Sequence, residues 1–321
     1  MSNALPMVTI IVPTRPGQAE IPSVTSSRAL DYPADKLEII VARGRQPAVQ
    51  RNHAIRAAQG ELIYFMDDDC VPSPGNLRRA VQYFTDPKVQ MVSGPNLCPP
   101  TAPLLEKVFA VVHGSWLAFG PSRARYTPVG QVRDTTEKEV IGCNLMARRA
   151  TMLELGGFHE ALYPNEDHPL YIELKKRRDK IIYDPEFVVH RRPRPTLKAF
   201  IKMLMGYGRG RAEEFRLTPT LGAAPNFVPP LFCLYLVLAL AASPWLGGWG
   251  FAPLALYALV VLGQTLISVF THGVFKSLLA LPLVVLTHIF YGIGFWRGLF
   301  TTLRKAGTGP RTEVVLDRFT V

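Results

Sequence analysis

The sequence predicts an α/β domain with a mainly parallel sheet flanked by helices, followed by a basic interfacial helix and a C-terminal transmembrane helical region. Three observations support this fold class. Strand-like and helix-like segments alternate over residues 8–93, an apolar run at residues 62–66 ends abruptly on three carboxylates, and the last third of the chain is almost free of charge. Because ligands of parallel sheets bind beyond the carboxyl ends of the strands, the acidic end of residues 62–66 marks the expected site.

Strands and helices are expected to alternate from the first apolar run onward. The strand segments are short runs of β-branched and other apolar residues, bounded by Gly, Pro or charged residues. The predicted strands are residues 8–12, 37–41, 62–66 and 89–93, and the predicted helices are about residues 21–30, 48–59 and 76–84. A strand–helix–strand unit of this length implies a right-handed crossover and parallel pairing. The order therefore indicates a nucleotide-binding type of half-domain.

The acidic cluster Asp67, Asp68 and Asp69 follows the strand at residues 62–66 directly. Three adjacent carboxylates repel one another, so the cluster needs either bulk solvent or a bound cation. Hard divalent cations such as Mg²⁺ or Mn²⁺ prefer oxygen ligands and often bridge a carboxylate to substrate phosphates. We interpret the cluster as a metal–diphosphate site, with a solvated acidic turn as the alternative.

The positive charge of the chain is concentrated in one segment. The 321 residues carry a formal net charge of +11. Residues 1–174 contain 17 basic and 18 acidic side chains, whereas residues 175–216 contain 13 basic and 5 acidic side chains. A juxtamembrane basic cluster facing anionic lipid explains this placement, at about 1 kcal/mol per Lys or Arg near the surface. Stacking aromatics and a reader motif do not accompany the cluster, so no nucleic acid is expected as a partner.

Residues 195–217, at the end of this segment, are predicted to form an amphipathic helix. Its apolar residues share one face, and its basic residues lie on or near the other. The apolar set is Leu197, Phe200, Ile201, Leu204 and Met205, and the basic set is Lys198, Lys202, Arg209 and Arg211. A helix with this pattern lies in the membrane interface.

Three apolar stretches follow, and the only charged residue from Val228 to Trp296 is Lys276. The stretches are residues 228–246, 251–270 and 278–296. Each is close to the roughly 20 residues that a spanning helix needs. Core helices of a soluble domain are the alternative, which three such runs in one block make unfavourable.

Several motifs in order resemble family-2 glycosyltransferases with the GT-A fold. The first part of the likeness is Val8 to Thr14, Gln50-Arg51-Asn52, Gly60-Glu61 and Phe65 to Asp69. The second part is Gly142 to Arg149, Gly156 to Glu160, Asn165-Glu166-Asp167 and Tyr183-Asp184-Pro185 through His190. The resemblance covers roughly residues 8–195. With the apolar C-terminal region, it is closest to the membrane-attached subgroup similar to succinoglycan-type sugar transferases, which extend lipid-linked saccharides.

The resemblance implies a donor site at the acidic strand end. Asp67 would reach the ribose or the metal, Asp69 would bind the divalent cation (Mn²⁺ or Mg²⁺) held by the sugar-nucleotide diphosphate, and Asp68 would support them. By family position, His190 is a metal or diphosphate contact, with a structural histidine as the alternative. The residues expected to bind the nucleotide are Pro13, Thr14, Arg15, Arg43, Arg51, Asp67 and Asp68.

Two of these arginines have specific arguments. Arg51 begins a predicted helix, where a guanidinium can bind phosphate bidentately, and a surface arginine is the alternative. Arg43 stands in the turn after the second strand, where family members often carry an acid that contacts the nucleotide base. This departure leaves open whether Arg43 meets the base or a phosphate.

The resemblance also implies a catalytic pair, with Asp167 as the base and Glu166 as a neighbour that orients the acceptor or tunes the pKa. An attacking hydroxyl must lose a proton, and a positioned carboxylate contributes about 10²–10⁴-fold to such a step. Helix capping is the competing role, because a helix is predicted over residues 168–178. The Gln-x-x-Arg-Trp signature of processive relatives is missing from residues 207–211, which favours addition of one sugar per binding event.

The sequence thus predicts a metal-dependent inverting glycosyltransferase that moves a sugar from a nucleotide diphosphate sugar to a hydroxyl of a lipid-linked saccharide. A polyprenyl-phosphate glycosyltransferase and a non-catalytic sugar-nucleotide-binding membrane scaffold are the alternatives. The expected divisions are 1–195 (GT-A domain), 196–225 (interfacial helix and linker), 226–300 (two to three spans) and 301–321 (basic tail).

The expected location is the inner (plasma) membrane, with several spans and a cytoplasmic catalytic domain, because sugar nucleotides are cytoplasmic and the domain has a basic flank. Three spans would place the basic tail outside, against the positive-inside rule. Either one stretch is re-entrant or interfacial, or the rule is violated. Pro282, Gly292 and Gly294 make the last stretch the best candidate for an irregular one.

Overall fold

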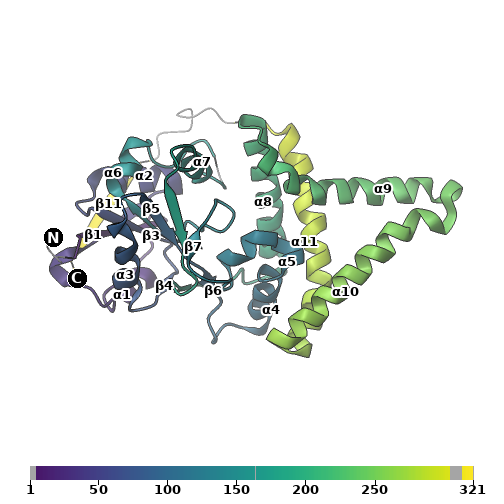
Figure 1. Ribbon diagram of the computed structural model, residues 1–321, viewed down its shortest axis with the longest axis horizontal. Helices are drawn as coiled ribbons and strands as arrows, with labels where there is room; N and C mark the ends of the chain where they lie inside the picture. Colours follow the sequence, from purple (N-terminus) through teal and green to yellow (C-terminus); the bar gives the residue numbers. More distant parts are fainter. Residues whose placement is uncertain (1–4, 163, 304–312, 321) are drawn as a thin grey trace.

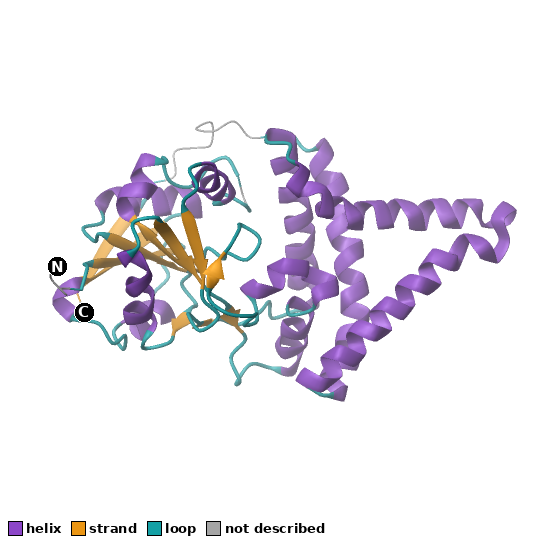
Figure 2. Ribbon diagram, viewed as in Figure 1, coloured by secondary structure: helices purple, strands orange, loops and turns teal. Residues whose placement is uncertain are grey.

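The computed structural model describes residues 5–162, 164–303 and 313–320 of the chain. An α/β domain occupies one side of the molecule, and a layer of long helices lies beside it (Figure 1). Figure 2 shows the strands gathered in the α/β domain, whereas the other part is entirely helical.

The central sheet has eight strands in the order β11-β2-β1-β3-β8-β5-β9-β7. Five of them point the same way: β1 (Val8–Thr14), β2 (Leu37–Arg43), β3 (Leu62–Met66), β5 (Val89–Ser93) and β9 (Lys180–Tyr183). The other three, β7 (Arg133–Asp134), β8 (Asn144–Arg148) and β11 (Val315–Thr320), pair antiparallel with their neighbours. The predicted mainly parallel sheet is confirmed, and the four strands predicted from residues 8–93 are all present.

Helices cover both faces of this sheet because the strands β1, β2, β3 and β5 are buried on both sides. One core contains side chains of α1 (Pro22–Ser27) and α3 (Asn76–Val81). The opposite core contains side chains of α2 (Pro47–Ala57), α6 (Arg149–Glu154) and α7 (His168–Lys176). The helices α1 and α3 are shorter than predicted, and α3 continues as a 3-10 turn over Gln82–Thr85.

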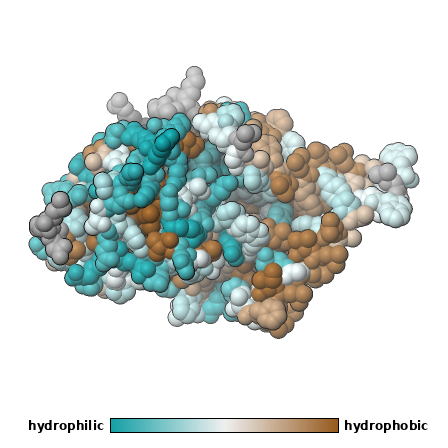
Figure 3. All heavy atoms as spheres, in the orientation of Figure 1, coloured by the Kyte–Doolittle hydropathy of each residue, from teal (hydrophilic) through white to brown (hydrophobic). Residues whose placement is uncertain are grey.

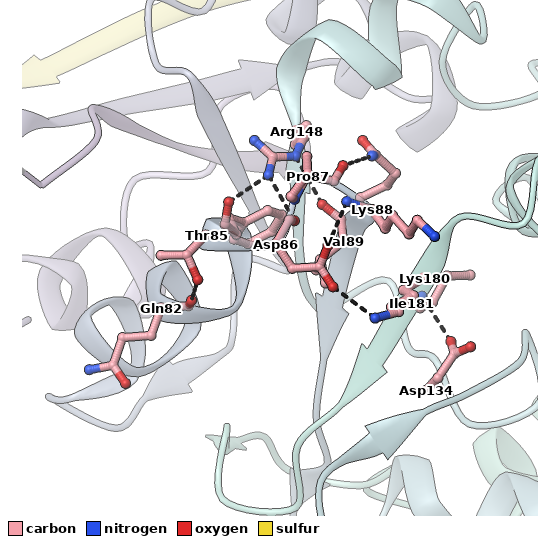
Figure 4. A network of polar contacts seen from close by, with 12 residues as sticks. Gln82, Thr85, Asp86, Pro87, Lys88, Val89, Asp134, Arg148, Lys180 and Ile181 are labelled. Carbon is pink, nitrogen blue, oxygen red and sulfur yellow. Dashed lines mark hydrogen bonds and ion pairs between the residues drawn. The ribbon is translucent and has the colours of Figure 1, made fainter. Parts of the chain in front are cut away.

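Strand β8 was not predicted, and it runs antiparallel between β3 and β5. Side chains fix it there: Arg148 Nε donates to the Val89 carbonyl at 2.9 Å, and Arg148 Nη2 donates to the Phe84 carbonyl at 2.6 Å. The neighbouring edge is tied by an ion pair of 2.8 Å between Lys180 Nζ and Asp86 Oδ2 (Figure 4). These contacts lock β5, β8 and β9 together.

A second, three-stranded sheet lies just beyond the acidic turn. Its strands are β4 (Val71–Pro72), β10 (Val189–His190) and β6 (Asn96–Leu97). His190 pairs with Val71, so the residues after β10 run alongside the turn at Asp67–Asp69. Gly94 lets the segment before β10 approach closely, because a Cβ at Gly94 would lie 2.0 Å from the Phe187 carbonyl oxygen.

The helical part contains α4 (Leu104–His113), α5 (Trp116–Phe119), α8 (Leu197–Leu217), α9 (Val228–Leu246), α10 (Ala252–His272) and α11 (Val274–Phe300). The 3-10 segment Gly120–Arg125 follows α5, Leu221–Phe227 joins α8 to α9, and Gly247–Phe251 joins α9 to α10. A third core joins α4, α8 and α11. In it, the rings of Phe109 and Phe200 stack at 4.3 Å. The apolar face of α8, which we expected against lipid, buries Phe200 and Leu204 in this core, so protein occupies that part of the face.

The C-terminal segment is not simply a basic tail. Residues Val315–Thr320 form β11, an edge strand that pairs antiparallel with β2 over six residues. Two ion pairs reinforce the pairing, Arg43 with Asp317 at 2.5 Å and Arg318 with Glu38 at 2.6 Å. The basic residues Arg304, Lys305 and Arg311 of the predicted tail lie outside the described residues.

Candidate active site at the carboxyl edge of the sheet

The carboxyl ends of β1, β2 and β3 lie side by side, because these strands are parallel and in matching register. Pro13 and Thr14 end β1 and are buried, and Arg15 follows as an exposed side chain. The Thr14 hydroxyl is buried without a hydrogen-bond partner among the described residues. A buried hydroxyl of this kind normally has a partner, and a ligand at this edge would provide one. The positions of these three residues agree with the predicted nucleotide pocket without testing it.

Arg43 is held at the same edge by the C-terminal strand. Its Nε pairs with Asp317 Oδ2 at 2.5 Å, and its Nη1 donates to the Gln18 carbonyl at 2.8 Å. The guanidinium is therefore already engaged on two sides. Binding of the nucleotide base or phosphate by Arg43 stays a prediction. Because Arg43 pairs with Asp317, β11 lies next to any ligand that Arg43 would bind.

Arg51 is buried and connects two parts of the site. Its Nη2 donates to Asp67 Oδ1 at 3.0 Å, and its Nη1 donates to Glu166 Oε1 at 2.9 Å. Only 7% of the Arg51 side chain is exposed. It is thus not a surface arginine, and both of its terminal nitrogens are bound to carboxylates. Arg51 thereby couples the acidic turn to the predicted catalytic segment, and its binding of phosphate stays a prediction.

Arg191 lies against the acidic turn. Its Nη1 is 2.7 Å from Asp67 Oδ2, and its Nε is 2.6 Å from Asp69 Oδ1. Burial opposes ionisation of Asp67, yet Arg191 and Arg51 together hold the pKa of this carboxyl below its usual value. For Asp69, burial outweighs the single guanidinium, so its pKa is raised. Sequence reasoning missed Arg191, although it follows His190 directly in the basic run at residues 191–194.

The carboxylates at this turn fit a metal–diphosphate site in which the protein supplies only some of the ligands. Among the residues that the structure describes, no three His, Cys, Asp or Glu side chains converge as a closed metal centre. Mg²⁺ and Mn²⁺ sites on nucleotides commonly use only one or two carboxylates, with substrate phosphates and water as the other ligands. Asp69 is 47% exposed and Asp67 24%, so both can be reached from solvent. In this structure, Arg191 compensates the negative charge of Asp67 and Asp69, as a bound cation would. His190 is half-buried on β10, and its metal contact stays a prediction.

Asp167 is the N-cap residue of α7, but its carboxylate makes no capping hydrogen bond. Instead, Asp167 Oδ2 accepts a hydrogen bond of 2.9 Å from the Tyr171 hydroxyl, one turn further along the helix. The capping alternative therefore does not account for this side chain. Burial, opposed by Arg51, raises the pKa of the neighbouring Glu166. Tyr171 is a second residue that sequence reasoning missed, since helical spacing alone does not show which carboxylate a tyrosine meets.

Asn52 fixes the loop that leads to these carboxylates. Its Nδ2 donates to the Phe158 carbonyl at 2.8 Å and to Glu160 Oε1 at 2.9 Å, while its Oδ1 accepts from the Phe158 N–H at 2.8 Å. Gly157 has φ +76°, and a Cβ there would lie 2.3 Å from Asn52 Oδ1. The Gly-Gly-Phe motif and Asn52 therefore form one structural unit, which joins α2 to the segment before α7.

Replacing Asn52 by Ala is expected to destabilise the α/β domain by about 2–4 kcal/mol, because the buried N–H and carbonyl of Phe158 lose their partners. Thermal unfolding of the purified full chain in detergent measures this as a lowered Tm. His53→Ala, at an exposed position on the same helix, is the matched control and should leave the Tm nearly unchanged. Equal effects of the two substitutions would contradict the role given to Asn52.

Replacing Arg191 by Ala is expected to tighten Mn²⁺ binding by the nucleotide-free chain at least about tenfold, because a charge-assisted hydrogen bond of about 1.5–3 kcal/mol no longer competes for Asp67 and Asp69. Titration calorimetry with Mn²⁺ measures the affinity. Arg192→Ala is the control, since Arg192 Nε pairs with Glu106 at 2.7 Å instead. Unchanged or weaker Mn²⁺ binding in the Arg191 variant would show that Arg191 does not compete with the cation.

Comparison with known families decides the assignment. Residues 2–205 match the family model described as glycosyltransferase like family 2, which is more than half of the chain. The chain belongs to this glycosyltransferase family. The predicted resemblance is confirmed, and it extends to enzymes of the succinoglycan type.

Two curated relatives of this family-2 glycosyltransferase cover part of the chain. It is 26% identical over 171 residues to the pre-mycofactocin glycosyltransferase of Mycobacterium tuberculosis, covering 52% of this chain and 34% of that protein. It is 28% identical over 207 residues to the succinoglycan biosynthesis protein ExoA of Rhizobium meliloti, covering 62% of this chain and 58% of that protein. The chain thus spans about a third of the length of the first relative and somewhat over half of the length of the second.

A solved structure shows the same fold. The mannosyltransferase PcManGT from Pyrobaculum calidifontis, determined in complex with GDP-Man and Mn²⁺, superposes on the family-2 chain with a TM-score of 0.55 at 21% identity. The match covers 86% of this chain and 87% of the mannosyltransferase. The sheet and its flanking helices therefore form a GT-A fold, as predicted.

Proposed function

We propose that this family-2 glycosyltransferase is an inverting enzyme that moves a sugar from a nucleotide diphosphate sugar to a hydroxyl of a lipid-linked saccharide. The observation that carries the proposal is the network Asp67–Arg51–Glu166, which brings the acidic donor turn and the predicted base segment into one site. Family membership supports the class of reaction. The relative ExoA, a succinoglycan biosynthesis protein, supports a role in cell-surface saccharide synthesis.

The reaction proposed is a single displacement at the anomeric carbon. The acceptor oxygen forms the new bond to this carbon, the bond from the carbon to the diphosphate oxygen breaks, and the nucleoside diphosphate leaves with the electron pair. Asp167 takes the proton of the acceptor hydroxyl, a step to which a positioned carboxylate contributes about 10²–10⁴-fold. Tyr171 donates to Asp167 and so fixes the direction of the carboxylate. Glu166, held by Arg51, orients the acceptor beside it.

Asp69 and Asp67 would hold a divalent cation together with the diphosphate of the donor. Such a cation offsets the charge that develops on the leaving diphosphate. The Mn²⁺ and GDP-Man bound by PcManGT are consistent with this assignment. With both carboxylates engaged in this way, Arg191 would be available as a positive group beside the diphosphate.

A recess beside Arg191 supports an acceptor that approaches from the helical layer. It is lined by residues of the segment after β10, of α4 and α8, and of the end of the 3-10 segment Gly120–Arg125, among them Arg191, Arg194, His113, Tyr207 and Tyr126. Burial, and then Arg194, lowers the pKa of His113 to about 3, so the ring is neutral, and its Nε2 has no hydrogen-bond partner among the described residues. The recess thus offers hydrogen-bonding groups and positive charge between the donor turn and the apolar helices.

Three helices that are long and apolar enough to cross a bilayer support membrane attachment. We place the enzyme in the inner (plasma) membrane with its catalytic domain in the cytoplasm, where sugar nucleotides are found. Confinement to the leaflet would raise the effective concentration of a lipid-linked acceptor, so the site needs to bind only the saccharide end.

The function is tested by incubating membranes that contain the full chain with a panel of radiolabelled nucleotide sugars and Mn²⁺. The expected result is transfer of one sugar into the fraction extracted by organic solvent. Membranes containing the Asp167→Asn variant are the control. Label that enters this fraction equally with the variant, or with membranes that lack the chain, would contradict the proposal.

A further inference from the structure

Both ends of the apolar helical region are tied to the same catalytic domain. At one end, α8 follows the small sheet directly and packs on α4. At the other end, β11 returns to the central sheet, where it pairs with β2 and forms the ion pairs of Asp317 and Arg318. A strand hydrogen-bonded into a sheet must lie on the same side of a membrane as that sheet.

The number of membrane crossings between α8 and β11 is therefore even. Residues 301–314 are too few to add another spanning helix of about 20 residues. Because three helices are apolar enough to span, at least one of them does not. The sequence alone left this choice open.

Helix α11 is the one that packs on the catalytic side. It runs parallel to α8 at very short range: a Cβ on Gly294 would lie 2.2 Å from the Met205 carbonyl oxygen, and a Cβ on Gly298 would lie 2.5 Å from that of Arg209. Small residues at such positions allow helix backbones to touch. Further along, Arg216 Nη1 donates to the carbonyls of Gly298 and Thr301. The partner helix α8 carries Arg209, Arg211, Glu213, Glu214 and Arg216, and these charges exclude it from the hydrocarbon.

The pair α9 and α10 differs from α11 in both position and exposure. The two helices project away from the rest of the molecule, whereas α11 lies alongside α8 (Figure 1). In their most apolar windows, 11% and 17% of the residues are buried, against 39% for α11. Figure 3 shows hydrophobic surface over this projection and hydrophilic surface over most of the α/β domain. Exposed apolar side chains such as Leu240 (71%), Leu259 (66%) and Phe270 (89%) cover it.

The dimensions and ends of this pair suit a bilayer. At 1.5 Å per residue, the 19 residues of α9 and the 21 residues of α10 are about 28 and 31 Å long, close to the ~30 Å hydrocarbon core. The outer end carries Trp245 and Trp249, exposed by 82% and 88%, and tryptophan favours the membrane–water interface. The inner end is next to Lys276, the only charge between Val228 and Trp296.

We propose that α9 and α10 form a membrane-spanning helical hairpin, which is the only part of the described chain that crosses the lipid bilayer. Trp245 and Trp249 lie at the far surface, α8 and α11 lie along the near surface, and the chain returns through β11 to the catalytic sheet. This topology rests on the membrane attachment given under the proposed function, but it does not depend on the reaction.

Cysteine labelling of the full chain in sealed membrane vesicles tests the topology. Three variants each add one cysteine to a Cys98→Ser, Cys233→Ala background, in which the remaining Cys70 and Cys143 are buried. Ala29→Cys marks the catalytic domain, Gly248→Cys marks the hairpin end, and Thr302→Cys marks the residues after α11. A membrane-impermeant maleimide is applied to right-side-out and to inside-out vesicles.

The expected result is that Ala29→Cys and Thr302→Cys react in vesicles of one orientation and Gly248→Cys in vesicles of the other, with at least about a tenfold preference. Reaction of all three in the same orientation would show that the hairpin does not cross, and would overturn the proposal. Reaction of Thr302→Cys together with Gly248→Cys would indicate three spans and would overturn it as well. Release of nucleoside diphosphate by the same variants in detergent reports on the reaction separately, so failure of one claim is distinguishable from failure of the other.

Discussion

Replacing Asp167 by Asn is expected to lower kcat by about 10²–10⁴-fold, while the Kd for the donor stays close to that of the unchanged chain. The amide keeps the size of the carboxylate and can still accept the hydrogen bond from Tyr171, but it cannot take the proton of the acceptor hydroxyl. Single-turnover transfer to acceptor, together with calorimetric titration of the donor, separates the two quantities.

Tyr171→Phe is the informative companion, because it keeps the base and removes only the hydrogen bond that orients it. A smaller loss, of about fivefold, is expected from one such bond of about 1 kcal/mol. If Asp167→Asn weakened donor binding as much as turnover, Asp167 would serve the nucleotide site instead. If Asp167→Asn left the rate unchanged, a phosphate acceptor that needs little base would be favoured, as in a polyprenyl-phosphate glycosyltransferase.

Replacing Asp69 by Ala is expected to abolish measurable turnover and to weaken binding of the donor in the presence of Mn²⁺. The diphosphate would lose the carboxylate that links its cation to the protein, and with it the charge compensation of the leaving group. Donor titrations with Mn²⁺ and with EDTA measure the effect: the difference between the two conditions should be large for the unchanged chain and small for the variant.

Asp35→Ala is the matched control, since Asp35 precedes the amino end of β2 and so lies at the opposite edge of the sheet. It should leave both titrations as they are for the unchanged chain. Metal-dependent donor binding that survives in the Asp69 variant would remove Asp69 from the cation site, and would point to the alternative of a solvated acidic turn.

The parts of the fold that sequence predicts are those determined by local pattern. The strands beginning at Val8, Leu37 and Leu62 are apolar runs that favour burial, and each connection between them is long enough to hold the helix that a parallel crossover needs. The direction of β8 is different, because a run such as Asn144–Arg148 looks the same in either direction. Its place between β3 and β5 depends on contacts of Arg148 with residues about 60 positions away.

Strand β11 depends even more strongly than β8 on long-range contacts that local sequence does not reveal. Its six residues alternate between charged and apolar types too weakly to stand out, and their partner strand lies more than 270 positions earlier. Long-range pairing of this kind is fixed by the whole fold, and local propensity carries little information about it. Because the strand was not predicted, the number of membrane crossings could not be deduced from sequence.

In the candidate site, too, local sequence pattern predicts some features, whereas long-range contacts determine others. The order of motifs pointed to Asp67, Asp69 and Asp167 as candidate site residues, because the family resemblance places carboxylates at these positions. It could not show that Arg51 joins Asp67 to Glu166, because these three residues come from separate elements. The same holds for Arg191, whose partners depend on the pairing of β10 with β4.

The most direct test of the account is the release of nucleoside diphosphate from a panel of nucleotide sugars by the purified full chain with Mn²⁺. We expect one donor, or a small group with the same nucleotide, to be consumed, with release stopped by EDTA and absent from the Asp69→Ala variant. A chain that consumes none of the donors, and binds no nucleoside diphosphate with or without Mn²⁺, would contradict a sugar-nucleotide site at Asp67 and Asp69.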